Sequence, residues 1–257
     1  MKTCMRNKES RLSKDSISHS PTIATLSVLV WLLLNLLPVR EANGQGTIIF
    51  NNRISGAAVN QTGHVWGATS YTSLIGLGSN DSPAGTTPYA PNGMSLIGAG
   101  GSGGRYGYRT TFAQLVGAIG KNMPESSLVP LAGVTTFRTG SSLGDVVAID
   151  STFVGNPASI DAPWATVMIV AWDNSSGLYS TWTQAYAAWQ MGLISAGHSA
   201  AFNVANIGGT ANPPPALTSA GAPINGLSFN LWPVPEPSMF ALAGLGAAAL
   251  MIFRRRK

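Results

Sequence analysis

The sequence predicts a mainly β fold, a β-sandwich with one or two short helices, between an N-terminal signal peptide and a single C-terminal hydrophobic helix. Three observations predict this class. Runs rich in β-branched and aromatic residues alternate with turn formers. Gly56 to Gly107 is dominated by Gly, Ser, Thr, Asn and Pro, which indicates short strands in long loops. Ala165–Asp173 is apolar on both faces, as expected of a central strand.

Shorter patterns predict the other strands in chain order. Gly46–Arg53 is β-branched and aromatic and ends in turn formers. Val134–Arg138 and Asp145–Asp150 flank a Gly-Ser-Ser turn, so they predict a hairpin. A Pro-rich loop separates two late strands, Ala200–Val204 and Leu227–Trp232.

Two segments with helical spacing predict the short helices. In Thr111–Gly120, apolar residues recur at i, i+3, i+4 and i+7, a pattern typical of one helix face. In Thr181–Met191, three aromatic residues recur at similar spacing. These two sets are Phe112, Leu115, Val116 and Ile119, and Trp182, Tyr186 and Trp189.

Residues 1–44 have the layout of a secretory signal peptide, which directs a chain to the Sec export machinery. A polar, basic start is followed by the apolar run Ile23–Leu37 and then by small residues. We expect cleavage after Gly44, with Gln45 as the first residue of the body, and cleavage after Ala42 is the alternative. An uncleaved N-terminal anchor is the other interpretation.

The last residues, 233–257, combine three elements in fixed order. Val234 to Ser238 reads Val-Pro-Glu-Pro-Ser, whose prolines prevent a helix from running in from upstream. Met239–Phe253 is almost wholly apolar, and four basic residues end the chain. The fifteen residues Met239–Phe253 would span about 22 Å as a helix, which is less than the hydrocarbon core of about 30 Å. A transient, processed anchor is therefore favoured over a permanent tail anchor.

These three elements together resemble the PEP-CTERM sorting signal of exported proteins from Gram-negative bacteria that make extracellular polysaccharide. The resemblance implies recognition by exosortase, a membrane-embedded protease-transpeptidase, while the helix 239–253 lies transiently in the inner membrane. It implies that the sorting motif is Pro235, Glu236 and Pro237, and that the membrane stop, the basic tail 254–257, is Arg254, Arg255, Arg256 and Lys257. Phe50-Asn51-Asn52 near the start of the body also resembles small proteins of this group, which are expected to be β-sandwich-like.

The charge and the cysteine content bound the function of the body, residues 45–232. The chain's net charge of +5 comes from its two ends, because the body has five basic and six acidic residues. The basic pI is therefore no argument for nucleic acid binding. Cys4, in the leader, is the only cysteine, so the body has no disulfide, thiolate nucleophile or cysteine metal site.

Gly140–Gly144 matches the Gly-x-Ser-x-Gly pattern, with Ser142 as a candidate nucleophile and His198 as a candidate base. A nucleophile elbow needs a helix after the serine, whereas Asp145–Asp150 alternates like a strand. A hairpin turn is therefore favoured. The alternative, a secreted hydrolase, predicts that Ser142 and His198 lie within hydrogen-bond reach.

Gly98–Gly103 matches Gly-x-Gly-x-x-Gly, the pattern of a dinucleotide-binding turn. That turn needs a helix that opens at the glycines and an acidic residue about 20 positions further on. Here Arg105 to Tyr108 intervene, and Glu125 does not end a strand. A glycine-rich loop is favoured, and no cofactor is expected.

Oxygen ligands for calcium are the next candidate chemistry. Four aspartates of the body could contribute, but none has Asp-x-Asp-x-Asp spacing, and isolated aspartates at strand ends are usually turn formers. His64 and His198 also lack metal-ligand spacing, so no metal is expected. The four aspartates are Asp145, Asp150, Asp161 and Asp173.

Tryptophans are frequent in the second half of the body. Exposed in a row, they could stack on sugar rings as in carbohydrate-binding modules, whereas Trp172 in the central strand is expected in the core. The five are Trp164, Trp172, Trp182, Trp189 and Trp232. The main hypothesis is a non-enzymatic exported protein with a structural or adhesive role at the cell surface or in a polysaccharide biofilm matrix. A carbohydrate-binding module is the first alternative.

Overall fold

A computed structural model of the chain describes residues 45–54, 61–67, 72–217 and 227–234. These belong to the second of two units, residues 43–257. The predicted leader (1–44) and the predicted helix and basic tail (239–257) lie outside the described residues. Within the described ranges, no helix combines the length and the apolar character needed to cross a membrane.

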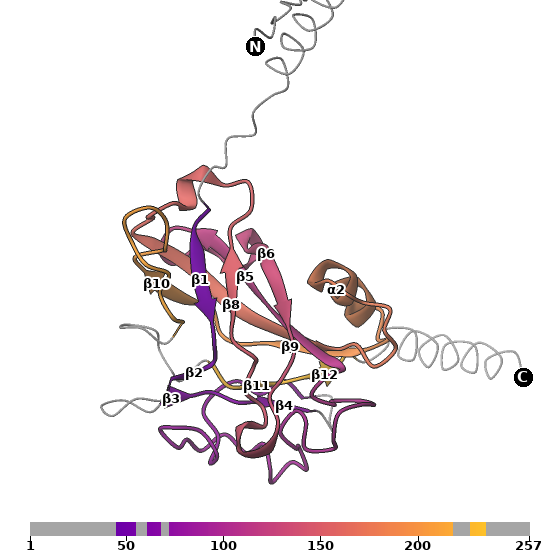
Figure 1. The fold of residues 1–257 in the computed structure, drawn as a ribbon. Helices are drawn as coiled ribbons and strands as arrows, with labels where there is room; N and C mark the ends of the chain where they lie inside the picture. The colour runs from indigo at the N-terminus through magenta and orange to yellow at the C-terminus, as the bar shows by residue number, and fades with distance from the viewer. Residues whose placement is uncertain (1–44, 55–60, 68–71, 218–226, 235–257) are drawn as a thin grey trace, which may run out of the picture. The chain divides into compact units, whose positions relative to one another are not determined.

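Most strands join one eight-stranded antiparallel sheet, in the order β1-β7-β6-β5-β8-β9-β12, with β10 also paired to β8 (Figure 1). The strands of this sheet are β1 (Thr47–Phe50), β5 (Thr111–Ile119), β6 (Val129–Thr135), β7 (Ile149–Thr152), β8 (Trp164–Asp173), β9 (Ser195–His198), β10 (Phe202–Ala205) and β12 (Trp232–Pro233). Two small sheets pair β4 (Val65–Trp66) with β11 (Phe229–Asn230), and β2 (Arg53–Ile54) with β3 (Gln61–Thr62).

The large sheet curls back on itself. β10 lies beside β8, and the chain that follows it returns to β1, where Gly208 bridges Thr47 and Ala216 bridges Ile49. The amide of Ile49 donates to the carbonyl of Pro215 at 2.9 Å. The mainly β class is confirmed, but the inner core lies among this curled sheet, the loops and the small β4–β11 sheet, which contributes Val65 and Phe229, rather than between two large stacked sheets. The reason is that β1 and β8 belong to the same sheet.

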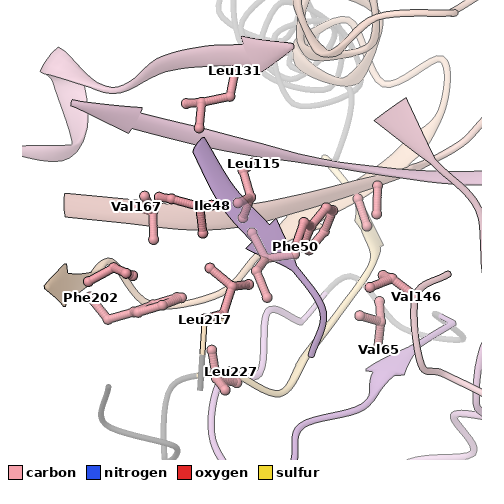
Figure 2. Packing of buried hydrophobic residues seen from close by; sticks show 14 of the residues in the cluster. Ile48, Phe50, Val65, Leu115, Leu131, Val146, Val167, Phe202, Leu217 and Leu227 are labelled. Atoms are coloured by element: carbon pink, nitrogen blue, oxygen red, sulfur yellow. The ribbon is translucent and has the colours of Figure 1, made fainter. Parts of the chain in front are cut away.

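β8 separates two apolar cores because alternate side chains of a strand point to opposite faces. Val167 and Ile169 enter the inner core, together with Ile48 and Phe50 of β1 (Figure 2). Trp172 enters the outer core with Met168 and Val170, on the face covered by α2 (Trp182–Gln190). The strand expected at Ala165–Asp173 is therefore confirmed as central and buried on both sides.

The short helix expected at Thr111–Gly120 is wrong: these residues form β5. β5 pairs along its whole length with β8, from Thr111 opposite Asp173 to Ile119 opposite Ala165. Leu115 lies in the inner core and Val116 in the outer one. A strand that is apolar on both faces produces the same spacing as one helix face, and the pairing partner decided between them.

The second expected helix is confirmed as α2. Thr181 caps it: the Thr181 hydroxyl accepts a hydrogen bond from the Gln184 amide, and the Gln184 side chain accepts one from the Thr181 amide. This reciprocal capping box satisfies amides that the first turn leaves without partners. Trp182 and Trp189 are buried beneath the helix, and Tyr186 is 48% exposed.

The hairpin around the Gly-Ser-Ser turn is confirmed, with boundaries that differ from the expectation. Phe137 bridges Val146, and Gly140–Ser142 forms a short 3-10 turn between them. The regular strands lie farther out, β6 ending at Thr135 and β7 beginning at Ile149. The first strand is confirmed as β1 and the two late strands as β10 and β11–β12, whereas β9 was not expected.

Candidate functional site

An aromatic cluster lies on the outer face of the large sheet, built from β8, α2 and β12. The ring centroids of Trp172 and Trp182 are 5.9 Å apart, and those of Trp182 and Trp189 are 6.1 Å apart. Trp232 meets Trp189 edge to face at 5.2 Å. Tyr186 lies 5.5 Å from Trp182 and 6.1 Å from Trp189, so it forms the exposed edge of the cluster.

A pocket of about 540 Å³ opens beside this cluster. Trp182, Tyr186 and Trp189 form its aromatic wall. Polar residues at the same pocket are Glu125, Ser126, Thr183, Gln190 and His198. Aromatic surface combined with a few hydrogen-bonding groups is the usual lining of a small-molecule site. The arrangement can hold a neutral ligand that has both an apolar face and hydroxyl groups.

The five tryptophans do not form one exposed row. Trp172 is fully buried and donates its indole hydrogen to the carbonyl of Tyr179, so its expected place in the core is confirmed. Trp182 and Trp189 are also mostly buried, each showing one side to the pocket. Trp164 lies elsewhere, 4.6 Å beneath the ammonium group of Lys121. Tyr186, which the sequence gives only as part of the helical spacing and not as a candidate for sugar stacking, lies beside Trp182 and Trp189 on α2.

Ser142 and His198 are not brought together. Ser142 lies on the hairpin turn, where its hydroxyl accepts a hydrogen bond from the Arg53 guanidinium. His198 belongs to β9, where its ring lies 6.5 Å from Trp189 and its Nδ1 lies 2.9 Å from the carbonyl of Ser199. A strand rather than a helix follows the turn, so the geometry that the hydrolase alternative requires is not present.

A second polar cluster is buried where β2, β4 and the hairpin meet. Nδ1 of His64 lies 2.6 Å from a carboxylate oxygen of Asp81, and Nε2 lies 3.5 Å from one of Asp145. Burial raises the pKa of Asp145, against the opposing effects of His64 and Arg53. Nearby, Asn52 donates to the carbonyls of Gly63 and Gly144. The cluster fastens these loops together, which gives the Asn52 of Phe50-Asn51-Asn52 a structural role.

The remaining sequence candidates lie apart from one another. Gly98–Gly103 is a loop before β5, with no helix opening at its glycines. Asp161 accepts hydrogen bonds from the backbone amides of residues 210–212 and the Thr210 hydroxyl, which lower its pKa to about 2. Asp150 is exposed on β7, and Asp173 lies 3.5 Å from Arg105. Among the described residues, no group of three or more acidic, histidine or cysteine side chains could hold a metal ion.

The C-terminal end of the body is attached to the aromatic cluster. Pro233 of β12 pairs with Ser195 of β9. The indole hydrogen of Trp189 is donated to the carbonyl of Trp232 at 2.7 Å, and Val234 packs against the same cluster. Val234 is the last described residue, and the next residue in the chain is Pro235, the first of the predicted Pro-Glu-Pro motif.

Fold and junction together define a mainly β body whose last strand leads without a linker into a Pro-Glu-Pro sequence and an apolar, basic tail. Residues 233–257 match the model of the PEP-CTERM protein-sorting motif. The chain therefore carries this motif, which supports an exported, membrane-transiting protein processed by exosortase. No curated protein and no solved structure matches the chain.

The individual site residues predicted for sorting are not described by the structure. Pro235, Glu236, Pro237 and the basic residues 254–257 lie within the matched range but outside the described residues. Of the residues at the predicted leader cleavage site, Ala42 and Gly44 are also outside, and Gln45 is the first described residue. The cleavage positions stay predictions.

Proposed function

We propose that this chain is a non-enzymatic protein of the cell surface or of the extracellular polysaccharide matrix, with a structural or adhesive role in a biofilm. The Sec machinery exports it, the C-terminal helix holds it at the inner membrane, and exosortase removes that helix. The observation that carries the proposal is the sorting motif at residues 233–257, joined directly to a packed β body. The nearly neutral body supports a role among uncharged surface polymers rather than nucleic acids.

Intact mass spectrometry of the protein recovered from the cell surface and the medium tests this proposal. We expect a chain that starts near Gln45 and ends between Pro235 and Ser238. Such a mass requires both processing events, and the protein should then fractionate with the polysaccharide. A chain that keeps Met239–Lys257 would contradict the proposal, because the tail would then be a resident membrane anchor.

Carbohydrate binding is the second candidate function, and the aromatic pocket favours it. Tyr186 offers a half-exposed ring beside Trp182 and Trp189, and Glu125 and Gln190 lie at the same pocket. Sugar rings present apolar C–H faces to aromatic rings while their hydroxyl groups hydrogen-bond to polar side chains. The ligand would be a segment of the producing cell's own extracellular polysaccharide.

Tyr186→Ala is expected to weaken binding of the purified polysaccharide by about five- to tenfold, because one stacking ring contributes about 1 to 1.5 kcal/mol. Affinity electrophoresis in gels that contain the polysaccharide measures the change. Leu178→Ala is a matched control, since Leu178 is 69% exposed and does not line the pocket. Equal retardation of both variants and the wild type would contradict carbohydrate binding at this pocket.

A further inference from the structure

The turn between α2 and β9 exposes two large apolar side chains close to the place where the chain leaves the body. Met191 is 58% exposed and Leu193 is 61% exposed. Leu193 lies only two residues before Ser195, which pairs with Pro233 of β12. Adjacent strands lie about 5 Å apart, so this turn flanks the exit of the C-terminal tail.

A cationic side chain lies at the same edge. The guanidinium of Arg105 donates to the hydroxyl of Ser195 at 3.2 Å, and the hydroxyl of Tyr106 donates to it at 2.9 Å. The Arg105 side chain is 64% exposed, whereas its acidic neighbour Asp173 is 5% exposed. Arg105 and Asp173 form an ion pair at 3.5 Å, and the cationic partner is the one that faces solvent.

The chain between this edge and the predicted anchor is short. Residues 235–238 are all that separate Val234 from Met239, where the apolar run begins. The five steps from Val234 to Met239 span at most about 18 Å in an extended chain. While the tail is in the membrane, Val234 is held within that distance of the lipid, and the edge that carries Met191, Leu193 and Arg105 lies next to it.

We propose that this edge contacts the outer surface of the inner membrane before the C-terminal tail is removed. Met191 and Leu193 enter the interface between headgroups and acyl chains, and Arg105 faces anionic headgroups. Exposed apolar residues beside a cation are the usual composition of an interfacial contact. The inference rests on the proposed anchoring by the tail. Two apolar side chains are too few to hold the body alone, so removal of the tail releases it from the lipid.

Fluorescence quenching by labelled lipid tests the contact. The protein is isolated in its tail-retaining form, with Pro235, Glu236 and Pro237 changed to alanine and Cys4→Ser, so that an introduced cysteine is unique. It is labelled at Leu193→Cys with an environment-sensitive dye and reconstituted into vesicles of phosphatidylcholine with a minority of phosphatidylglycerol and spin-labelled lipid. We expect several-fold stronger quenching there than at Val154→Cys.

Val154 is a control that matches Leu193 in exposure but lies far from the exit of the tail. It is 64% exposed and follows β7, near the Ile119 end of β5, whereas the turn lies near the opposite, Thr111 end. Flotation with the vesicles reports anchoring separately. Protein that floats but is quenched equally at both positions overturns the membrane contact alone. Protein that does not float overturns the anchoring and, with it, the contact.

Discussion

With Pro235, Glu236 and Pro237 all replaced by alanine, the protein is expected to accumulate in the membrane fraction with residues 239–257 still attached. Proline fixes its own φ and disfavours a helical conformation in the residue before it, and Glu236 is the only charged residue between the last strand and the apolar run. Alanine favours helix instead, so the apolar helix could extend upstream. The form that exosortase recognises would be lost, and nearly all of the processed species with it.

Intact mass and membrane fractionation measure this outcome in the producing cells. Ser238→Ala is the control, since it changes the neighbouring residue and leaves both prolines and the glutamate in place. Normal release of the triple-alanine chain would show that processing does not depend on the Pro-Glu-Pro sequence. The assignment of these three residues would then be wrong, although the exported body would be unaffected.

Trp172→Ala is expected to lower the free energy of unfolding by about 3 to 5 kcal/mol, which is a large part of the stability of a domain of this size. Trp172 is fully buried on the central strand and contacts Phe112 and Trp182. Its loss leaves a large cavity between the sheet and α2, and it leaves the carbonyl of Tyr179 without its indole donor. Urea unfolding followed by circular dichroism measures the change.

Trp164→Ala is the matched control, because it is the same substitution at the other end of β8. Trp164 is half-buried beneath Lys121 and lies outside both apolar cores, so the expected loss is much smaller. Equal destabilisation by the two substitutions would contradict the importance of Trp172 in the outer core for stability. Trp172→Phe retains most of the ring volume and should recover part of the stability.

Part of the fold could be predicted because the determining interactions are local in sequence. Thr181 and Gln184 cap α2 from within its own first turn, so the helix is specified by adjacent residues. Ala165–Asp173 is continuously apolar, which is typical of a strand buried on both faces. The helix predicted at Thr111–Gly120 is wrong, because the apolar spacing of this segment fits a helix face as well as a strand between two cores.

The candidate site was less predictable than the elements that form it. The sequence offers five tryptophans as candidates for sugar stacking. The burial of each ring determines whether it can contact a ligand, and that burial depends on the residues that pack over the ring. Glu125 and His198 both line the pocket although they are far apart in the sequence, and nothing in their local sequence relates them to Tyr186. Only the pairing of Ser195 with Pro233 brings the turn that contains Met191 and Leu193 next to the C-terminal tail.

The sequence by itself determined that the chain carries a C-terminal sorting motif and that its body is mainly β. A sorting motif is a linear order of prolines, apolar residues and basic residues, so it can be recognised from the sequence without knowledge of the fold. Only the tertiary structure decided that the sheet curls around one core, that an aromatic pocket lies on its outer face, and that the motif leaves the body beside that pocket. These features come from residues far apart in the chain, such as Thr47 with Gly208 and Trp189 with Trp232, which local patterns do not encode.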